Sequence, residues 1–140
     1  MKKQTIIAIV AVLIVAIIIG GVIAVNNNNS GNKDSVKIES AKDMKKMFST
    51  INSNLKEKLP SLETQEIDVS DEMQVQTYTG LKSNENVEAL VVSEPMMSSQ
   101  AYSAVAVKVK SGANVEKMKQ EMLDNIDMAK WICVSASNLY

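Results

Sequence analysis

The chain opens with a long hydrophobic stretch and then changes to shorter, alternating patterns. Ile6–Val25 contains no charged residue, amide or hydroxyl. As an α-helix such a segment reaches about 30 Å, which matches the hydrocarbon core of a bilayer. Lys2 and Lys3 precede it, and basic residues in short flanks favour the cytoplasmic side. The pattern predicts an uncleaved, single-pass membrane anchor over residues 6–25, with residues 1–5 as a cytoplasmic tail and the remaining chain outside.

Two other interpretations of this segment stay open. A secretory signal has an apolar core of roughly 7–15 residues and a small-x-small cleavage site. Here the core is longer, and the best site, after Ala24, has Val22 where a small residue belongs. A buried core helix would need a large protein around it. The spacing of Ala16, Gly20 and Ala24 also suits close packing of two membrane helices, although small residues are common in such segments by chance.

A polar spacer and an amphipathic helix follow the predicted anchor. Residues 26–40 begin with Asn26–Asn29 and are predicted as a flexible linker. Ser40 is a suitable N-cap, and Pro60 ends the helical pattern. Apolar side chains recur between them at intervals of three and four: Met44, Met47, Phe48, Ile51, Leu55 and Leu59. The intervening lysines fit a helix packed on a domain, which we favour, or one lying on anionic lipid.

The second half of the chain predicts a small sheet. Val87–Val92 is a short apolar run, and Ala101–Lys110 alternates with lysines on one face, as in a strand with one buried side. A helix capped by Asn114 separates this strand from a third apolar run, Trp131–Ser135. We therefore expect residues 41–140 to form an extracytoplasmic α+β domain. Its sheet should follow the order β-β-α-β along the chain, with helices packed on one face.

The segment before these strands is acidic. Glu66–Val69 suggests a short strand, and Asp71 suggests the start of a brief helix that stops at Gly80. The carboxylates of the segment are candidates for glycan hydrolysis or calcium binding: Glu63, Glu66, Asp68, Asp71 and Glu72. Their spacing does not match the calcium loop of EF-hands. A solvated acidic loop is the favoured interpretation.

Composition excludes several kinds of chemistry. All 15 basic residues are lysine, and the chain has no Arg and no His. Imidazole catalysis and bidentate Arg recognition are therefore excluded within this chain, and without a basic face we expect no nucleic-acid partner. Cys133 lies among apolar neighbours without a basic partner, which predicts a buried, inert thiol. Nine methionines invite a Cu(I) site, but no His or second Cys completes one, so we expect neither metal nor cofactor.

The stretch Glu88–Leu123 (EALVVSEPMMSSQAYSAVAVKVKSGANVEKMKQEML) resembles an uncharacterised family of membrane-anchored, extracytoplasmic proteins of Gram-positive bacteria, known as a domain of unknown function. The shared features are two strands, an acidic-Met-Ser loop between them, and a helix opening with Val115-Glu116. The resemblance implies an anchor and an α+β domain, and no catalytic residue. Family members continue past the position of Tyr140 with a further apolar strand. The resemblance therefore implies a domain that is truncated or divergent at its C-terminus.

Two classes of function remain. The absence of His and Arg favours a non-enzymatic module that sits on the bilayer and binds a protein partner at the cell surface. The loop after the first strand offers candidate contact residues, Glu94, Met96 and Met97, because adjacent exposed methionines form an adaptable apolar surface. Burial of both methionines beneath the sheet is the open alternative. The competing class is a cell-envelope hydrolase or transferase that uses carboxylates.

Overall fold

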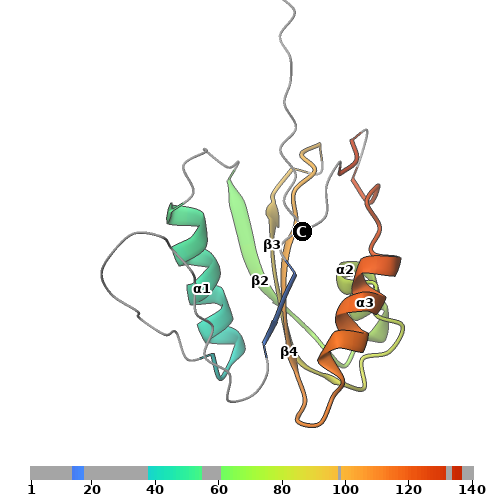
Figure 1. The fold of residues 1–140 in the computed structure, drawn as a ribbon. Coiled ribbons are helices and arrows are strands. Elements are labelled where there is room, and N and C mark those ends of the chain that lie inside the picture. Colours follow the sequence, from blue (N-terminus) through green and yellow to red (C-terminus); the bar gives the residue numbers. More distant parts are fainter. Residues whose placement is uncertain (1–13, 18–37, 55–60, 98, 132–133, 137–140) are drawn as a thin grey trace, which may run out of the picture.

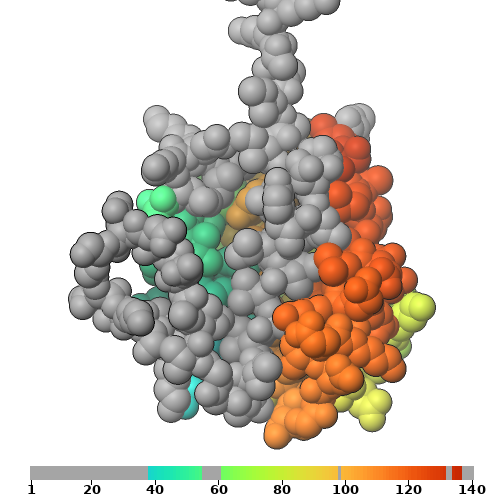
Figure 2. Space-filling view, viewed as in Figure 1, coloured from blue at the N-terminus to red at the C-terminus, as the bar shows by residue number. Residues whose placement is uncertain are grey.

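The computed structural model describes residues 14–17, 38–54, 61–97, 99–131 and 134–136. These residues form an α+β fold, as the sequence predicts, whose sheet has the strand order β1-β4-β3-β2. In chain order the elements are β1 (Ile14–Ile17), α1 (Ala41–Asn54), β2 (Leu62–Ile67), α2 (Glu72–Thr79), β3 (Val87–Pro95), β4 (Ala104–Val109) and α3 (Val115–Asn125). β2, β3 and β4 are antiparallel, and β1 runs parallel to β4. α1 lies on one side of the sheet and α2 and α3 on the other (Figures 1 and 2).

The two central strands are buried on both faces, because successive side chains of a strand point to opposite sides. On one face, alternate residues of β3 and β4 form a cluster with α2 and α3 that includes Leu90, Val92, Val105, Val107, Val109, Met118 and Met122. On the other face, Val91, Ala104 and Ala106 pack against α1. The prediction that helices cover only one face is therefore wrong. The small side chains of Ala104 and Ala106 belong to a covered face, which alternation alone did not reveal.

A lysine that suggested a solvent-facing side is itself buried. Lys108 is 7% exposed, and its Nζ donates to Glu88 Oε1 at 2.5 Å and to the carbonyl oxygen of Glu39 at 2.8 Å. A buried ammonium is tolerated when a carboxylate and further hydrogen bonds accompany it. Lys108 thereby joins β4 to β3 and to the residue just before α1.

α1 packs its apolar stripe on the sheet, as favoured from its periodicity. Met44 and Phe48 are fully buried, and Ile38 joins the same cluster. Ile38 falls within residues 26–40, the predicted linker, so packing begins before the helix does. Burial of this stripe leaves it unavailable for lying on lipid.

The helix boundaries follow capping residues that the sequence indicates. Asp43 Oδ2 accepts hydrogen bonds from the Ser40 amide and hydroxyl at the start of α1. The side chains of Asp71 and Asn114 accept from backbone amides in the first turns of α2 and α3, at 3.1 and 3.0 Å, which satisfies donors that a helix leaves unpaired. Gly80 ends α2 in the left-handed region, at φ 75°. α3 ends at Asn125.

The strand that joins β3 and β4 in the antiparallel part of the sheet is β2, whereas Trp131–Ser135 was predicted as the third strand. β2 pairs with β3 along its whole length, from Leu62 opposite Pro95 to Ile67 opposite Leu90. Trp131 and residues 134–136 form no strand, and the Ala136 amide donates to the Met128 carbonyl at 2.7 Å. Cys133 lies outside the described residues, and its burial stays a prediction.

Only four residues of the predicted anchor are described, and they are extended. Ile14–Ile17 pair with β4 from Ile14 opposite Val105 to Ile17 opposite Lys108. Pairing with a sheet edge satisfies the backbone of such a segment in water, whereas in a bilayer a helix satisfies it internally. In the part of the chain that the structure describes, no helix has the length and apolarity to cross a membrane. The rest of Ile6–Val25 lies outside the described residues, so the anchor stays a prediction.

Gly80 allows a matched test of this packing. A Cβ at Gly80 would lie 2.8 Å from Asn125 C and Ile126 N, whereas a Cβ at Gly112 would meet nothing within 4 Å. Both glycines have positive φ. We expect Gly80→Ala to lower the free energy of unfolding by at least about 2 kcal/mol and Gly112→Ala by about 1 kcal/mol, since only the first adds a backbone clash to the strain. Urea unfolding followed by circular dichroism measures both; equal losses would contradict this packing.

Candidate functional site

The connection between β3 and β4 carries the predicted contact residues. Met96 and Met97 are 73% and 64% exposed, so of the two alternatives left open they are exposed at the hairpin end and not buried beneath the sheet. The Met96 amide donates to the Ser61 carbonyl at 3.3 Å, which ties the start of the loop to the residue before β2. At the other end of the loop, Tyr102 is buried against α1. The side chains of Met96 and Met97 therefore project from a loop whose two ends are fixed, by the hydrogen bond to Ser61 and by the burial of Tyr102.

Glu94, the third predicted contact residue, takes part in an ion pair at the base of the loop. Its Oε1 forms an ion pair with Lys130 Nζ, in which the two side chains are only 23% and 14% exposed. The same ammonium lies 3.3 Å from Ser103 Oγ, at the other end of the hairpin. Glu94 is thus occupied with Lys130 and holds the base of the loop, while Met96 and Met97 form its exposed part.

Two aromatic rings complete this cluster. Lys130 Nζ lies 5.2 Å from the centroid of the Tyr78 ring and 5.3 Å from that of Trp131, within the range of cation–π attraction. Burial raises the pKa of Tyr78, and the nearby Glu94 carboxylate raises it further. Four elements meet here: α2, β3, the start of β4 and the segment after α3. The ammonium joins them.

The contact between Ser103 and Lys130 resembles part of a serine–lysine pair, but its surroundings do not suit catalysis. A lysine base needs a free Nζ, whereas Nζ of Lys130 is engaged in the ion pair with Glu94. Ser103 is 1% exposed, so a substrate cannot reach its hydroxyl. Sequence reasoning missed this cluster because its members are far apart in the chain, and only the hairpin and the turn after α3 bring them together.

The acidic segment does not assemble a catalytic pair. Asp71 caps α2, and its pKa is lowered chiefly by the hydrogen bond from the Gln74 side chain. The pKa of Asp68 is lowered chiefly by the hydroxyl of Ser70, within a turn. Glu63 and Glu66 are exposed on β2. Among the described residues, no group of three or more carboxylate or thiol side chains could hold a metal ion, and Met118 and Met122 belong to the core.

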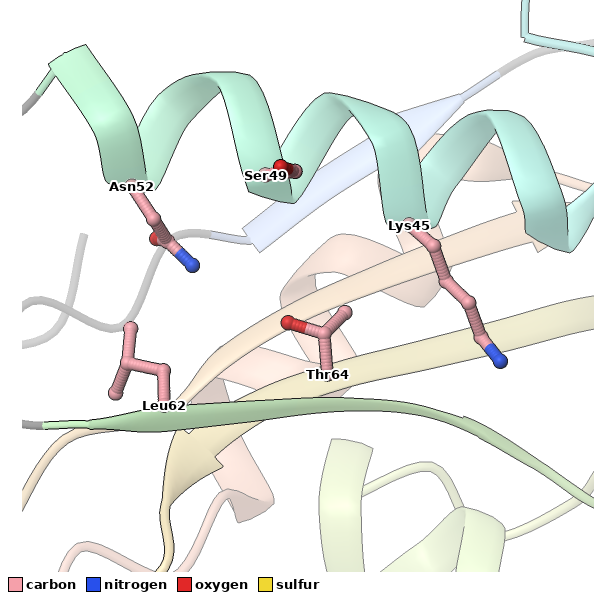
Figure 3. A pocket seen from close by; sticks show the side chains of 5 residues that line it. All are labelled: Lys45, Ser49, Asn52, Leu62 and Thr64. Carbon is pink, nitrogen blue, oxygen red and sulfur yellow. The ribbon is translucent and has the colours of Figure 1, made fainter.

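A polar groove of about 420 Å³ lies between α1 and β2 (Figure 3). Lys45, Ser49 and Asn52 line it from α1, and Leu62 and Thr64 line it from β2. In Figure 3 the side chains of Lys45 and Asn52 extend from α1 toward β2, and Thr64 points back toward the helix. No residue of this groove was predicted as functional, because serine, threonine and asparagine on a helix and a strand carry no recognisable motif.

Comparison of the chain with protein-family models, with curated proteins and with solved structures finds no match. Fold and site geometry therefore carry the functional inference by themselves.

The Lys130–Glu94 pair can be tested against an exposed pair in the same protein. Lys130→Met leaves a largely buried carboxylate without its partner and should lower the free energy of unfolding by about 1–3 kcal/mol. Lys119→Met, which removes the exposed Lys119–Glu116 pair, should change it by less than about 0.5 kcal/mol. Urea unfolding followed by circular dichroism measures both. Equal effects would show that Lys130 does not hold the hairpin base.

Proposed function

We propose that this chain is a membrane-anchored module that binds a protein partner at the cell surface through the loop Glu94–Gln100, and that it is not an enzyme. In this proposal Ile6–Val25 crosses the bilayer as a helix with its N-terminus in the cytoplasm, so that Ile14–Ile17 is helical in the membrane and is not paired with β4 as in the described structure. The folded domain lies outside. The length of the apolar run and the two preceding lysines support this arrangement. Neither nucleic acid nor a cofactor takes part.

The exposure of Met96 and Met97 is the observation that carries the proposal. Among the described residues, the large apolar side chains of the core are buried, whereas these two adjacent thioethers face solvent. Methionine is unbranched and polarisable, so a pair of them can adapt to an apolar surface on another protein. The Lys130–Glu94 pair holds the loop base, which lowers the entropy lost when the loop binds.

The carboxylate-enzyme alternative gains no support from the described residues. The carboxylates with shifted pKa values, Asp43, Asp68 and Asp71, are lowered by local hydrogen bonds at helix starts and turns. A general acid would need a raised pKa in a cleft. The resemblance of Glu88–Leu123 to an uncharacterised extracytoplasmic family agrees with the anchor and implies no activity. We propose membership of that family on this resemblance alone.

Site-specific photo-cross-linking in intact cells tests the proposal. A photoreactive amino acid at position 97 should yield a defined cross-linked protein, because the partner contacts the loop. The same group at position 73 should not, although Met73 is as exposed, at 77%. Met96→Asp should abolish the product at position 97, since a carboxylate cannot enter an apolar contact.

Two results would contradict the proposal. The first is identical products from positions 97 and 73, which would indicate collision rather than binding. The second is a product at position 97 that survives Met96→Asp in a variant with unchanged circular dichroism.

A further inference from the structure

The groove between α1 and β2 has features of a binding site that the methionine loop does not explain. Its polar lining consists of one ammonium, two hydroxyls and one amide, and among the described residues no carboxylate lines it. Polar side chains thus line it from both a helix and a strand, and among them only Lys45 is charged. An acceptor-rich ligand is the natural complement of such a lining.

Two of these groups are held in place from below. Ser93, which is fully buried on β3, accepts a hydrogen bond from Thr64 Oγ1 at 2.9 Å and one from Asn52 Nδ2 at 3.3 Å. This shared acceptor links β3, β2 and α1 beneath the groove. Side chains fixed before binding lose less entropy when a ligand arrives.

The same amide is incompletely satisfied. Asn52 Oδ1 is buried and has no hydrogen-bond partner among the described residues. Such an acceptor costs about 1–3 kcal/mol of folding free energy. Unsatisfied groups of this kind are uncommon and call for an explanation. One explanation is that Asn52 is retained because its Nδ2 donates to Ser93 Oγ and so holds the amide at the groove.

Lys45 gives the groove its charge. In the part of the chain that the structure describes, Lys45 has no carboxylate partner, whereas the largely buried Lys108 and Lys130 are each paired with a glutamate. The neighbouring Lys42 and Lys46 are exposed on the same helix. The groove therefore lies in a locally positive region with an uncompensated ammonium at its rim.

We propose that this groove binds a phosphate group carried by a polyol, as in a glycerophosphate. Lys45 pairs with the phosphate, and the hydroxyls and amide of Ser49, Thr64 and Asn52 contact the polyol. Lysine acts on phosphate as a point charge, whereas planar carboxylates are better matched by arginine, which this chain lacks. Lys45 and Asn52 are seven residues apart, about 10 Å along the helix, which leaves room for more than a bare anion.

The same chemistry occurs in soluble or polymeric glycerophosphates and in lipid headgroups, and one experiment separates these sources. The full chain is placed in nanodiscs of phosphatidylcholine, and binding of radiolabelled glycerol 3-phosphate is measured by equilibrium dialysis. A second set of nanodiscs contains phosphatidylglycerol. Loss of label binding in the second set identifies the headgroup as an occupant; unchanged binding identifies the soluble source.

Matched variants decide whether the groove is the site. Lys45→Gln and Thr64→Val should each weaken label binding about tenfold, the loss of one good hydrogen bond to a charged group. Lys46→Gln removes the same charge from a position that does not line the groove and should leave binding within about twofold. Circular dichroism checks that each variant keeps its fold.

Absence of saturable binding by the wild type would overturn the proposal. An equal loss in Lys45→Gln and Lys46→Gln would also overturn it, because binding would then reflect general charge on α1. These outcomes are independent of the methionine loop, which the label does not contact, so they leave the proposed protein-binding function to its own test.

Discussion

The structure depends on one constraint: the antiparallel pair β3–β4 is apolar on both faces. Val91 and Val92 are neighbours in the chain, point to opposite sides of the sheet, and are both fully buried. Water must be excluded from each face, so a helix layer is required on each side. α1 covers one face, and α2 and α3 cover the other (Figure 1). The positions of the groove and of the hairpin loop both follow from this arrangement.

Charge is placed so that the sheet can be covered in this way. Lys108 would oppose burial of its face, and Glu88 together with the Glu39 carbonyl compensates its ammonium. At the hairpin end the ammonium of Lys130 is compensated in the same way, by the Glu94 carboxylate, the Ser103 hydroxyl and two aromatic rings. With these polar groups engaged inside the domain, the thioethers of Met96 and Met97 remain exposed, and Lys45 has no carboxylate partner among the described residues.

Local signals in the sequence predicted much of the fold. Asp71, Gly80 and Asn114 determine helix ends through hydrogen bonds and backbone angles within a few residues, so spacing alone identifies them. The alternation in Ala101–Lys110 predicted a strand correctly. It could not reveal that both faces are buried, because that depends on Glu88 reaching Lys108 from the neighbouring strand.

Long-range contacts limited the remaining predictions. β2 begins at Leu62, before the expected strand Glu66–Val69, and Trp131 and residues 134–136 form no strand. Short apolar or acidic runs do not specify their partners, so the sequence alone cannot assign them. The loop composition left the exposure of Met96 and Met97 open against their burial beneath the sheet. The ion pair of Glu94 could not be predicted, because Lys130 is far away in sequence. The α1–β2 groove could not be recognised from the sequence, because hydroxyl and amide side chains also occur on ordinary solvent-exposed surfaces.

The central claim, a sheet buried on both faces, is tested most directly by threonine substitution at two adjacent positions. Val91→Thr and Val92→Thr keep the side-chain shape and add a hydroxyl on opposite faces. Each should lower the free energy of unfolding in urea by about 1–3 kcal/mol, the penalty for burying a polar group with poor compensation. Val134→Thr, at a position that is 36% exposed, should stay within about 0.5 kcal/mol. A large loss at only one of Val91 and Val92, with the other behaving like Val134, would show that one face is open to water and would contradict the account.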